Sequence, residues 1–125
     1  MKPHAWLVCG ALLAALSVTM GAFGAHGLKE YLEAAKRVDT FETAARYHMY
    51  HAIALVLVGL LASAGSNRAL DVAGGCFLAG ILIFSGLCYA LALGGPKYLG
   101  AIVPIGGVAF IAGWVALAVG ALRSR

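Results

Sequence analysis

Four long apolar segments, residues 5–25, 47–64, 72–93 and 101–122, dominate this chain. A helix that crosses a bilayer needs about 20 apolar residues, because an α-helix rises about 1.5 Å per residue. Each segment is close to that length. The sequence therefore predicts an all-α integral membrane protein, a bundle of four transmembrane helices.

The composition leaves no room for a soluble domain. Hydrophobic residues make up 62% of the 125 residues and charged residues only 11%, so a water-soluble fold could not cover its surface with polar groups. The 9 Lys and Arg outnumber the 5 acids and stand at segment ends, where they meet lipid headgroups. We expect a single transmembrane domain over residues 1–125, with the lipid bilayer as its partner and no nucleic acid.

The first segment has two interpretations. Lys2 precedes an apolar run that ends in Ala22-Phe23-Gly24, which is a tolerable cleavage site for a secretory signal peptide. The run is longer than a usual signal core, and three more spans follow it. We therefore expect it to remain as the first transmembrane helix.

Between the first two spans, apolar residues recur at helical spacing over residues 28–38, with charged residues on the opposite side. This pattern predicts a short amphipathic helix, lying either in the membrane interface or over the loops of the bundle. The next helix is expected to begin at Asp39, which has capping-box spacing to Glu42, and to continue through residue 64.

Two further boundaries follow from the sequence. Ser66 or Asn67 is expected to cap the third span, because side-chain oxygens of these residues accept from free backbone N–H groups. Proline is tolerated only in the first turn of a helix. The fourth span is therefore expected to begin near Pro104 or near Ala101.

Glycines recur on two spans at spacings that place them on one helix face. Such faces let helices approach closely in membranes. We expect close helix packing at these glycines, within the chain, with a membrane-protein partner or in a homo-oligomer. They are Gly21 and Gly24 on the first span and Gly106, Gly113 and Gly120 on the fourth.

Polar side chains gather where the first span ends and the second begins: His26, Arg46, Tyr47, His48 and His51. Unpaired polar groups are costly in a bilayer, so we expect these groups to pair as a clasp that fixes helix register. A metal or haem site is a second interpretation, because imidazoles are good ligands. A site for a lipid, a quinone or an anionic headgroup, made by Arg46, Tyr47 and His51, is a third.

No recognisable catalytic motif accompanies this cluster. The hydroxyls in or near spans belong to Ser17, Thr19, Ser63 and Ser85, and none stands in a nucleophile motif. No metal ligand set and no cofactor is assigned. We expect a protein that is not an enzyme.

Several motifs, in order along the whole chain, resemble one family. They are residues 21–28 (GAFGAHGL), 41–52 (FETAARYHMYHA), 84–86 (FSG) and 104–107 (PIGG), with Gly113-Trp114. The chain resembles a small bacterial inner-membrane family of unknown function that includes YgdD and is similar to animal transmembrane protein 256. The resemblance implies four membrane helices in the bacterial inner (cytoplasmic) membrane. It brings no activity or substrate, and His48 stands where the family more often has Gln.

Together these observations predict a structural or accessory membrane component that packs with partners or with itself. The alternative is a binder or transporter of a lipid, quinone, metal or haem that uses His26, Arg46 and His51. An even number of spans puts both termini on one side, and basic residues beside the spans favour the inside.

Overall fold

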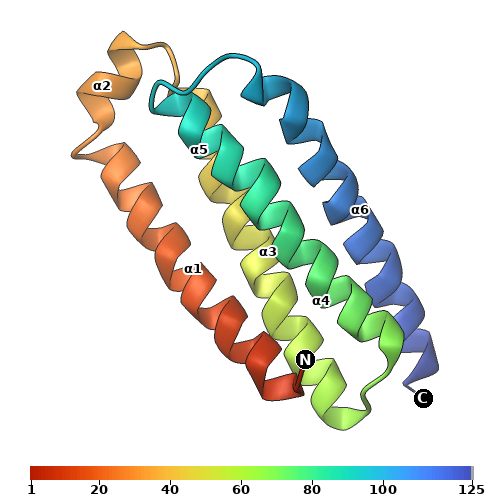
Figure 1. Cartoon of the computed structure of the whole chain (residues 1–125). Helices are drawn as coiled ribbons and strands as arrows, with labels where there is room; N and C mark the ends of the chain where they lie inside the picture. The colour runs from red at the N-terminus through yellow and green to blue at the C-terminus, as the bar shows by residue number, and fades with distance from the viewer. Residues whose placement is uncertain (125) are drawn as a thin grey trace.

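The computed structural model describes residues 1–124, and these residues form helices joined by short loops (Figure 1). The elements are α1 (Pro3–Ala25), α2 (Lys29–Ala34), α3 (Val38–Ala64), α4 (Arg68–Gly80), the π-helix η1 (Ile81–Ser85), α5 (Gly86–Ala92) and α6 (Leu99–Arg123). Because α4, η1 and α5 run on without a break, the described residues form 4 helices long and apolar enough to cross a membrane. The predicted all-α, four-span architecture is confirmed.

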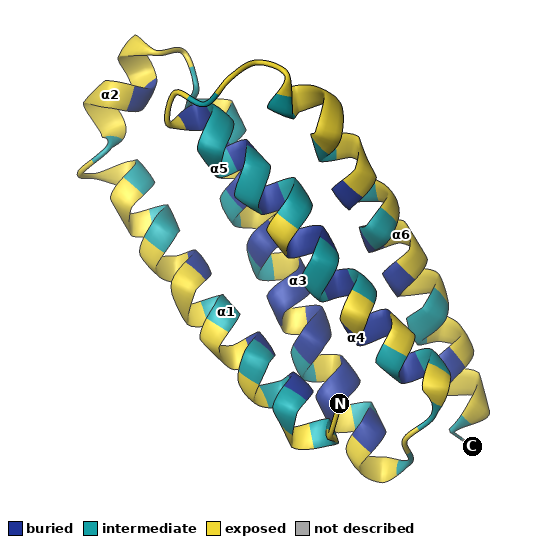
Figure 2. Ribbon diagram, viewed as in Figure 1, coloured by how far each residue is buried: buried dark blue, intermediate teal, exposed yellow. Residues whose placement is uncertain are grey.

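The helices pack mainly in the order α1, α3, the α4–η1–α5 rod and α6. Each long helix therefore packs mainly on the long helix that precedes or follows it in the sequence. Both termini lie at the same end of the bundle, and α2 lies at the other end (Figure 1). The outer helices α1 and α6 therefore present broad exposed faces, whereas α3 and the rod carry most of the buried residues (Figure 2).

Glycines set the distance between α1 and α3. A Cβ at Gly10 would lie 2.7 Å from the carbonyl oxygen of Ala52, and one at Gly59 would lie 2.6 Å from the backbone nitrogen of Leu7. No side chain fits at either point. The two backbones therefore pack as closely as small-residue contacts in membranes allow.

The main core lies between α3, the rod and α6. Leu55, Val58 and Phe77 are buried within it. Trp6 closes the core at the end where the termini lie, and its ring Nε1–H donates to Asp71 Oδ1 at 3.1 Å. The same end is tied by Asn67, whose Nδ2 donates to the carbonyl oxygen of Gly120 at 3.0 Å.

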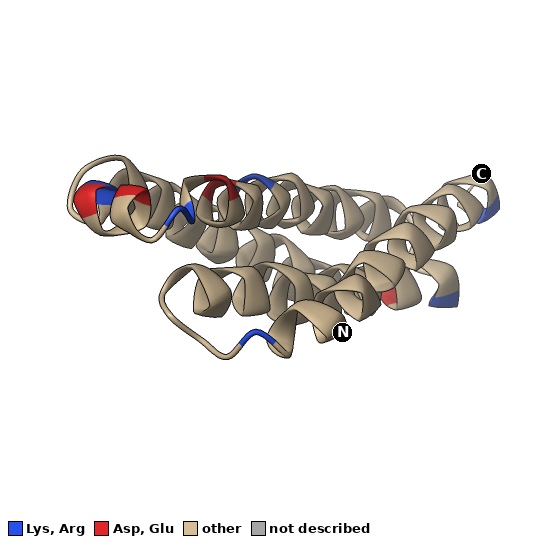
Figure 3. Ribbon diagram, turned by 90° about the horizontal axis from the view of Figure 1, so that it is seen from above, with Lys and Arg blue, Asp and Glu red and all other residues tan. Residues whose placement is uncertain are grey.

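The short helix predicted between the first two spans is α2. Its Leu32 is buried against Phe41 and Ala92, so α2 covers the end of the bundle. Lys29, Glu30 and Glu33 remain exposed. Charged residues gather here and at the opposite end, and they leave the long middle of the bundle uncharged (Figure 3).

Two predicted helix starts need correction. Helix α3 begins at Val38, and Asp39 forms no capping hydrogen bond, because the chain is already turning: Phe41 N–H donates to the Arg37 carbonyl at 3.0 Å. Helix α6 begins at Leu99, earlier than either predicted start, and Pro104 lies inside it. The predicted cap at Asn67 is confirmed by a bond from Leu70 N–H to Asn67 Oδ1 at 3.2 Å.

Candidate functional site

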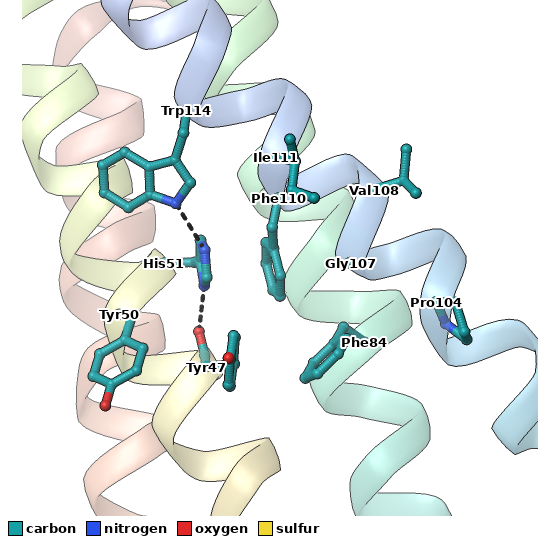
Figure 4. Close-up of a pocket in the computed structure, with 10 residues that line it drawn as sticks. All are labelled: Tyr47, Tyr50, His51, Phe84, Pro104, Gly107, Val108, Phe110, Ile111 and Trp114. Atoms are coloured by element: carbon teal, nitrogen blue, oxygen red, sulfur yellow. Dashed lines mark hydrogen bonds between the residues drawn. The ribbon is translucent and has the colours of Figure 1, made fainter.

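Helices α3 and α6 make few contacts with each other, and a crevice of about 650 Å³ opens between them (Figure 4). This volume lies within the roughly 300–1,000 Å³ of typical small-molecule sites. We call it the α3/α6 crevice. Its lining is almost entirely apolar and aromatic: Tyr47, Tyr50, His51, Phe84, Pro104, Gly107, Val108, Phe110, Ile111 and Trp114.

His51 lies at the deep side of the crevice and has both ring nitrogens engaged (Figure 4). Its Nδ1–H donates to the carbonyl oxygen of Tyr47 at 2.7 Å, since a carbonyl can only accept. Its Nε2 accepts from the Nε1–H of Trp114 at 3.1 Å. These two bonds fix the tautomer and leave neither nitrogen free to bind a metal ion.

Aromatic rings hold His51 in place. The ring of Phe110 stacks on the imidazole with centroids 3.5 Å apart and planes 8° apart, and Trp114 meets Phe77 edge-on at 5.0 Å. Tyr47 packs on Phe84, with centroids 4.9 Å apart. This contact brings α3 against η1 and forms the other wall of the crevice.

A second polar pair joins α3 to α5. Nδ1 of His48 is hydrogen-bonded to the hydroxyl of Tyr89 at 2.9 Å, and Tyr89 also meets Phe41 edge-on at 5.2 Å. Two buried side-chain polar atoms in residues 1–124 have no hydrogen-bond partner, His48 Nε2 and Ser85 Oγ. Ser85 ends the π-helix, an element that often occurs at functional sites.

The structure does not bring together all the polar residues that the sequence grouped. His26 is exposed at the end of α1 and lines a hollow made by its own helix, and it has no hydrogen bond to His51 within the described residues. Arg46 is also exposed, and its Nε donates to the Glu42 carbonyl at 3.4 Å. Tyr47 and His51 alone among the predicted residues line the crevice.

The separation of His26 from His51 has a simple geometric cause. Helix α3 begins at Val38, so His51 lies 13 residues into it, roughly 20 Å along its axis. His26 lies at the end of α1, beside α2. The sequence-based prediction placed both near one membrane face because it counted the second span from residue 47.

The fourth-span glycines pack within the chain. A Cβ at Gly113 would lie 2.7 Å from the Phe77 ring, one at Gly120 would lie 2.6 Å from Leu70 Cδ2, and one at Gly106 would overlap the Phe84 backbone. On α1, Gly24 lies against Phe41, whereas a Cβ at Gly21 would meet nothing within 4 Å.

Sequence reasoning missed the residues of the rod and of α6 that complete the crevice, Phe84, Phe110 and Trp114. One signal was present for Trp114, because an indole N–H inside a membrane span needs an acceptor. Nothing in the sequence tells which residue on which helix supplies it.

The fold and the crevice define a class, the small polytopic helical membrane proteins. Within it, the chain belongs to the family described as "Protein of unknown function (DUF423)", which matches residues 20–107. The predicted resemblance to a small bacterial membrane family of unknown function is thereby confirmed.

Relatives of nearly the same length support this assignment. The chain is 43% identical over 118 residues to a UPF0382 membrane protein of Staphylococcus epidermidis, covering 94% of this chain and 95% of that one. It is 42% identical over 119 residues to the UPF0382 membrane protein YwdK of Bacillus subtilis, covering 94% and 96%. A UPF0382 membrane protein of Haemophilus influenzae is 40% identical over 120 residues, covering 96% and 95%. No solved structure matches the chain.

Proposed function

We propose that this chain is a non-enzymatic accessory protein of the bacterial cytoplasmic membrane, which acts by packing against a membrane partner or a second copy. The observation that supports this role is the position of α1 at the edge of the bundle. Helix α1 packs on α3, weakly on α2 and, through Trp6, on α4, and much of its remaining surface is apolar and exposed.

The polar side chains inside the spans support a role without chemistry. Ser17 Oγ–H donates across helices to the Ala45 carbonyl at 2.9 Å, and Ser63 Oγ–H donates to Gly59 of its own helix at 2.8 Å. The Nε1–H of Trp114 donates a hydrogen bond to Nε2 of His51. These groups serve helix packing, which is the usual use of such residues in membranes.

The partner surface differs from the one that the glycine spacing suggested. Gly24, Gly106, Gly113 and Gly120 are covered by Phe and Leu side chains of this chain. An incoming helix would instead meet the outer side of α1, where Leu12 is 67% exposed.

Photo-crosslinking in intact cells tests this role. With benzoylphenylalanine in place of Leu12, we expect one discrete protein adduct, either a dimer or a single hetero-adduct. The matched control is Leu82, which is 64% exposed on the rod and should give none. Lipid adducts alone at Leu12, together with a monomeric mass for the purified chain, would contradict the proposal.

The ligand-binding alternative retains one specific observation, the α3/α6 crevice. Its metal and haem versions fit the residues poorly, because His51 uses both nitrogens and His26 lies elsewhere. Elemental analysis should find no stoichiometric metal in the purified chain. About one metal ion per chain, lost equally in His51→Ala and His51→Gln, would restore the metal version.

A further inference from the structure

The α3/α6 crevice opens toward the bilayer. Its outer lining includes Val108 and Ile111, which are 65% and 67% exposed on a transmembrane helix and so face the hydrocarbon. A ligand would therefore enter sideways from the membrane. An apolar chain fits the lining, because the Nε1–H of Trp114 already donates to Nε2 of the buried His51.

The free polar groups of the crevice stand at one end. The hydroxyls of Tyr47 and Tyr50 make no hydrogen bond within residues 1–124, and their side chains are 41% and 52% exposed. Tyr47 lies one turn and Tyr50 one residue nearer than His51 to the start of α3, and helical side chains lean toward the start of their helix. Both hydroxyls therefore lie on the side of the crevice nearer the end of the bundle where charged residues gather. A ligand is thus offered donors on the side of the crevice nearer the charged end and only apolar contact on the other side.

Arg46 supplies a positive charge at this end. It stands one turn before Tyr50 on α3, and its guanidinium makes no ion pair within residues 1–124. The neighbouring acid Glu42 lines a hollow beside α1 and α2 rather than the crevice, and Asp39 lies a further turn away. Lys97, in the loop between α5 and α6, adds a second cation at the end of the bundle where α2 lies.

We propose that the α3/α6 crevice is a phospholipid site, in which one acyl chain lies along the aromatic lining and the headgroup phosphate binds Arg46 and Tyr50. Arginine and tyrosine donors suit phosphate oxygens, and headgroup-level basic residues beside a pocket are typical of lipid recognition. Diacylglycerol offers the same acyl chains without the phosphate and so separates the two parts of the site.

The test is native mass spectrometry of the full chain in mild detergent, after addition of equal amounts of phosphatidylglycerol and diacylglycerol with identical acyl chains. We expect one retained phosphatidylglycerol per chain. Gly107→Leu should fill the crevice with little strain, because a Cβ there would lie 3.8 Å from Phe84 Cδ2. We expect it to reduce lipid retention about tenfold, equivalent to about 1.4 kcal/mol.

Gly75→Leu is the matched control, since a Cβ there would meet nothing within 4 Å and the site lies on α4, outside the crevice. It should retain lipid like the unaltered chain. If Gly107→Leu does not fold, Ile111→Trp fills the crevice from an exposed position. Arg46→Gln should keep the acyl contact but remove most of the preference for phosphatidylglycerol over diacylglycerol.

Four outcomes would overturn the proposal. They are no retained lipid, equal retention in Gly107→Leu and Gly75→Leu, equal binding of phosphatidylglycerol and diacylglycerol, and a quinone or a hydrophobic peptide in the crevice instead. The α1 crosslinking result is independent of all four, so the accessory role and the lipid site can fail separately.

Discussion

His51 shows how one residue settles the packing of two helices. Within residues 1–124, the bond from Trp114 Nε1–H to Nε2 of His51 is the only hydrogen bond found between α3 and α6, and Phe110 covers the His51 ring. Removing the imidazole would leave the Trp114 N–H without an acceptor in an apolar setting. Such an orphaned donor costs more than the bond itself contributes.

We therefore expect His51→Ala to lower the free energy of unfolding in detergent by about 1–3 kcal/mol. His51→Gln should lower it less, because an amide can still accept from Trp114. The control is His26→Ala, which removes an exposed side chain and should change little. Equal losses for the Ala and Gln variants would contradict a clasp.

Ser17 and Ser85 differ in whether their hydroxyls have a hydrogen-bond partner. Both hydroxyls are buried, but Ser17 Oγ–H donates to the Ala45 carbonyl, whereas Ser85 Oγ has no partner. We expect Ser17→Ala to destabilise the chain by about 1 kcal/mol and Ser85→Ala to be neutral or stabilising. A loss for Ser85→Ala as large as that for Ser17→Ala would mean that a bound water or ligand satisfies its hydroxyl.

At the scale of elements, the four spans follow from hydropathy because length and apolarity suffice to define a membrane helix. The Asn67 cap could also be predicted, because it depends only on a side-chain oxygen beside the first free N–H groups of the helix. The position of Pro104 was not predicted, because the preceding turn carries its own bonds, with Leu99 N–H donating to the Pro96 carbonyl at 3.1 Å. The helix thus starts early, and Pro104 lies inside it, where the missing N–H leaves the Gly100 carbonyl without its usual helical donor.

The π-helix and the crevice could not be predicted in this way. No residue in Ile81–Ser85 marks a change from i+4 to i+5 bonding. The sequence identified polar residues on α3, yet their partners depend on how each helix is rotated about its axis. That rotation is set by contacts such as Gly113 against Phe77, which join distant residues.

Gly106, Gly113 and Gly120 of α6 pack against side chains of the rod. Gly113→Leu places a side chain where the Phe77 ring lies, and overpacking of this kind costs about 1–3 kcal/mol or more. We expect a lower melting temperature in detergent. Gly75→Leu, an equal change at an open site on α4, should melt like the unaltered chain. An unchanged melting profile for Gly113→Leu would mean that this face of α6 meets lipid.

At the scale of the whole molecule, both termini lie at one end and α2 at the other. The end with the termini carries Lys2, Arg68 and Arg123 with a single acid, Asp71, whereas the basic residues in and beside α2 are mixed with the acids Glu30, Glu33, Asp39 and Glu42. We infer that the termini face the cytoplasm, since positively charged flanks are retained there.

Reporter fusions check this orientation. A reporter that works only in the cytoplasm should be active at either terminus and inactive in the loop near Glu33. A secreted-side reporter should give the reverse pattern. Opposite results for the two termini would contradict an even number of spans.

The serial order of the helices bears on how the chain is made. Every extensive helix contact joins consecutive long helices, α1 with α3, α3 with the rod, and the rod with α6. Pairing of sequence neighbours keeps contacts local, and local contacts form fast. Each helix can therefore dock as it leaves the insertion machinery, on a partner that is already in the bilayer. The nascent chain need not wait for its last span to protect its first.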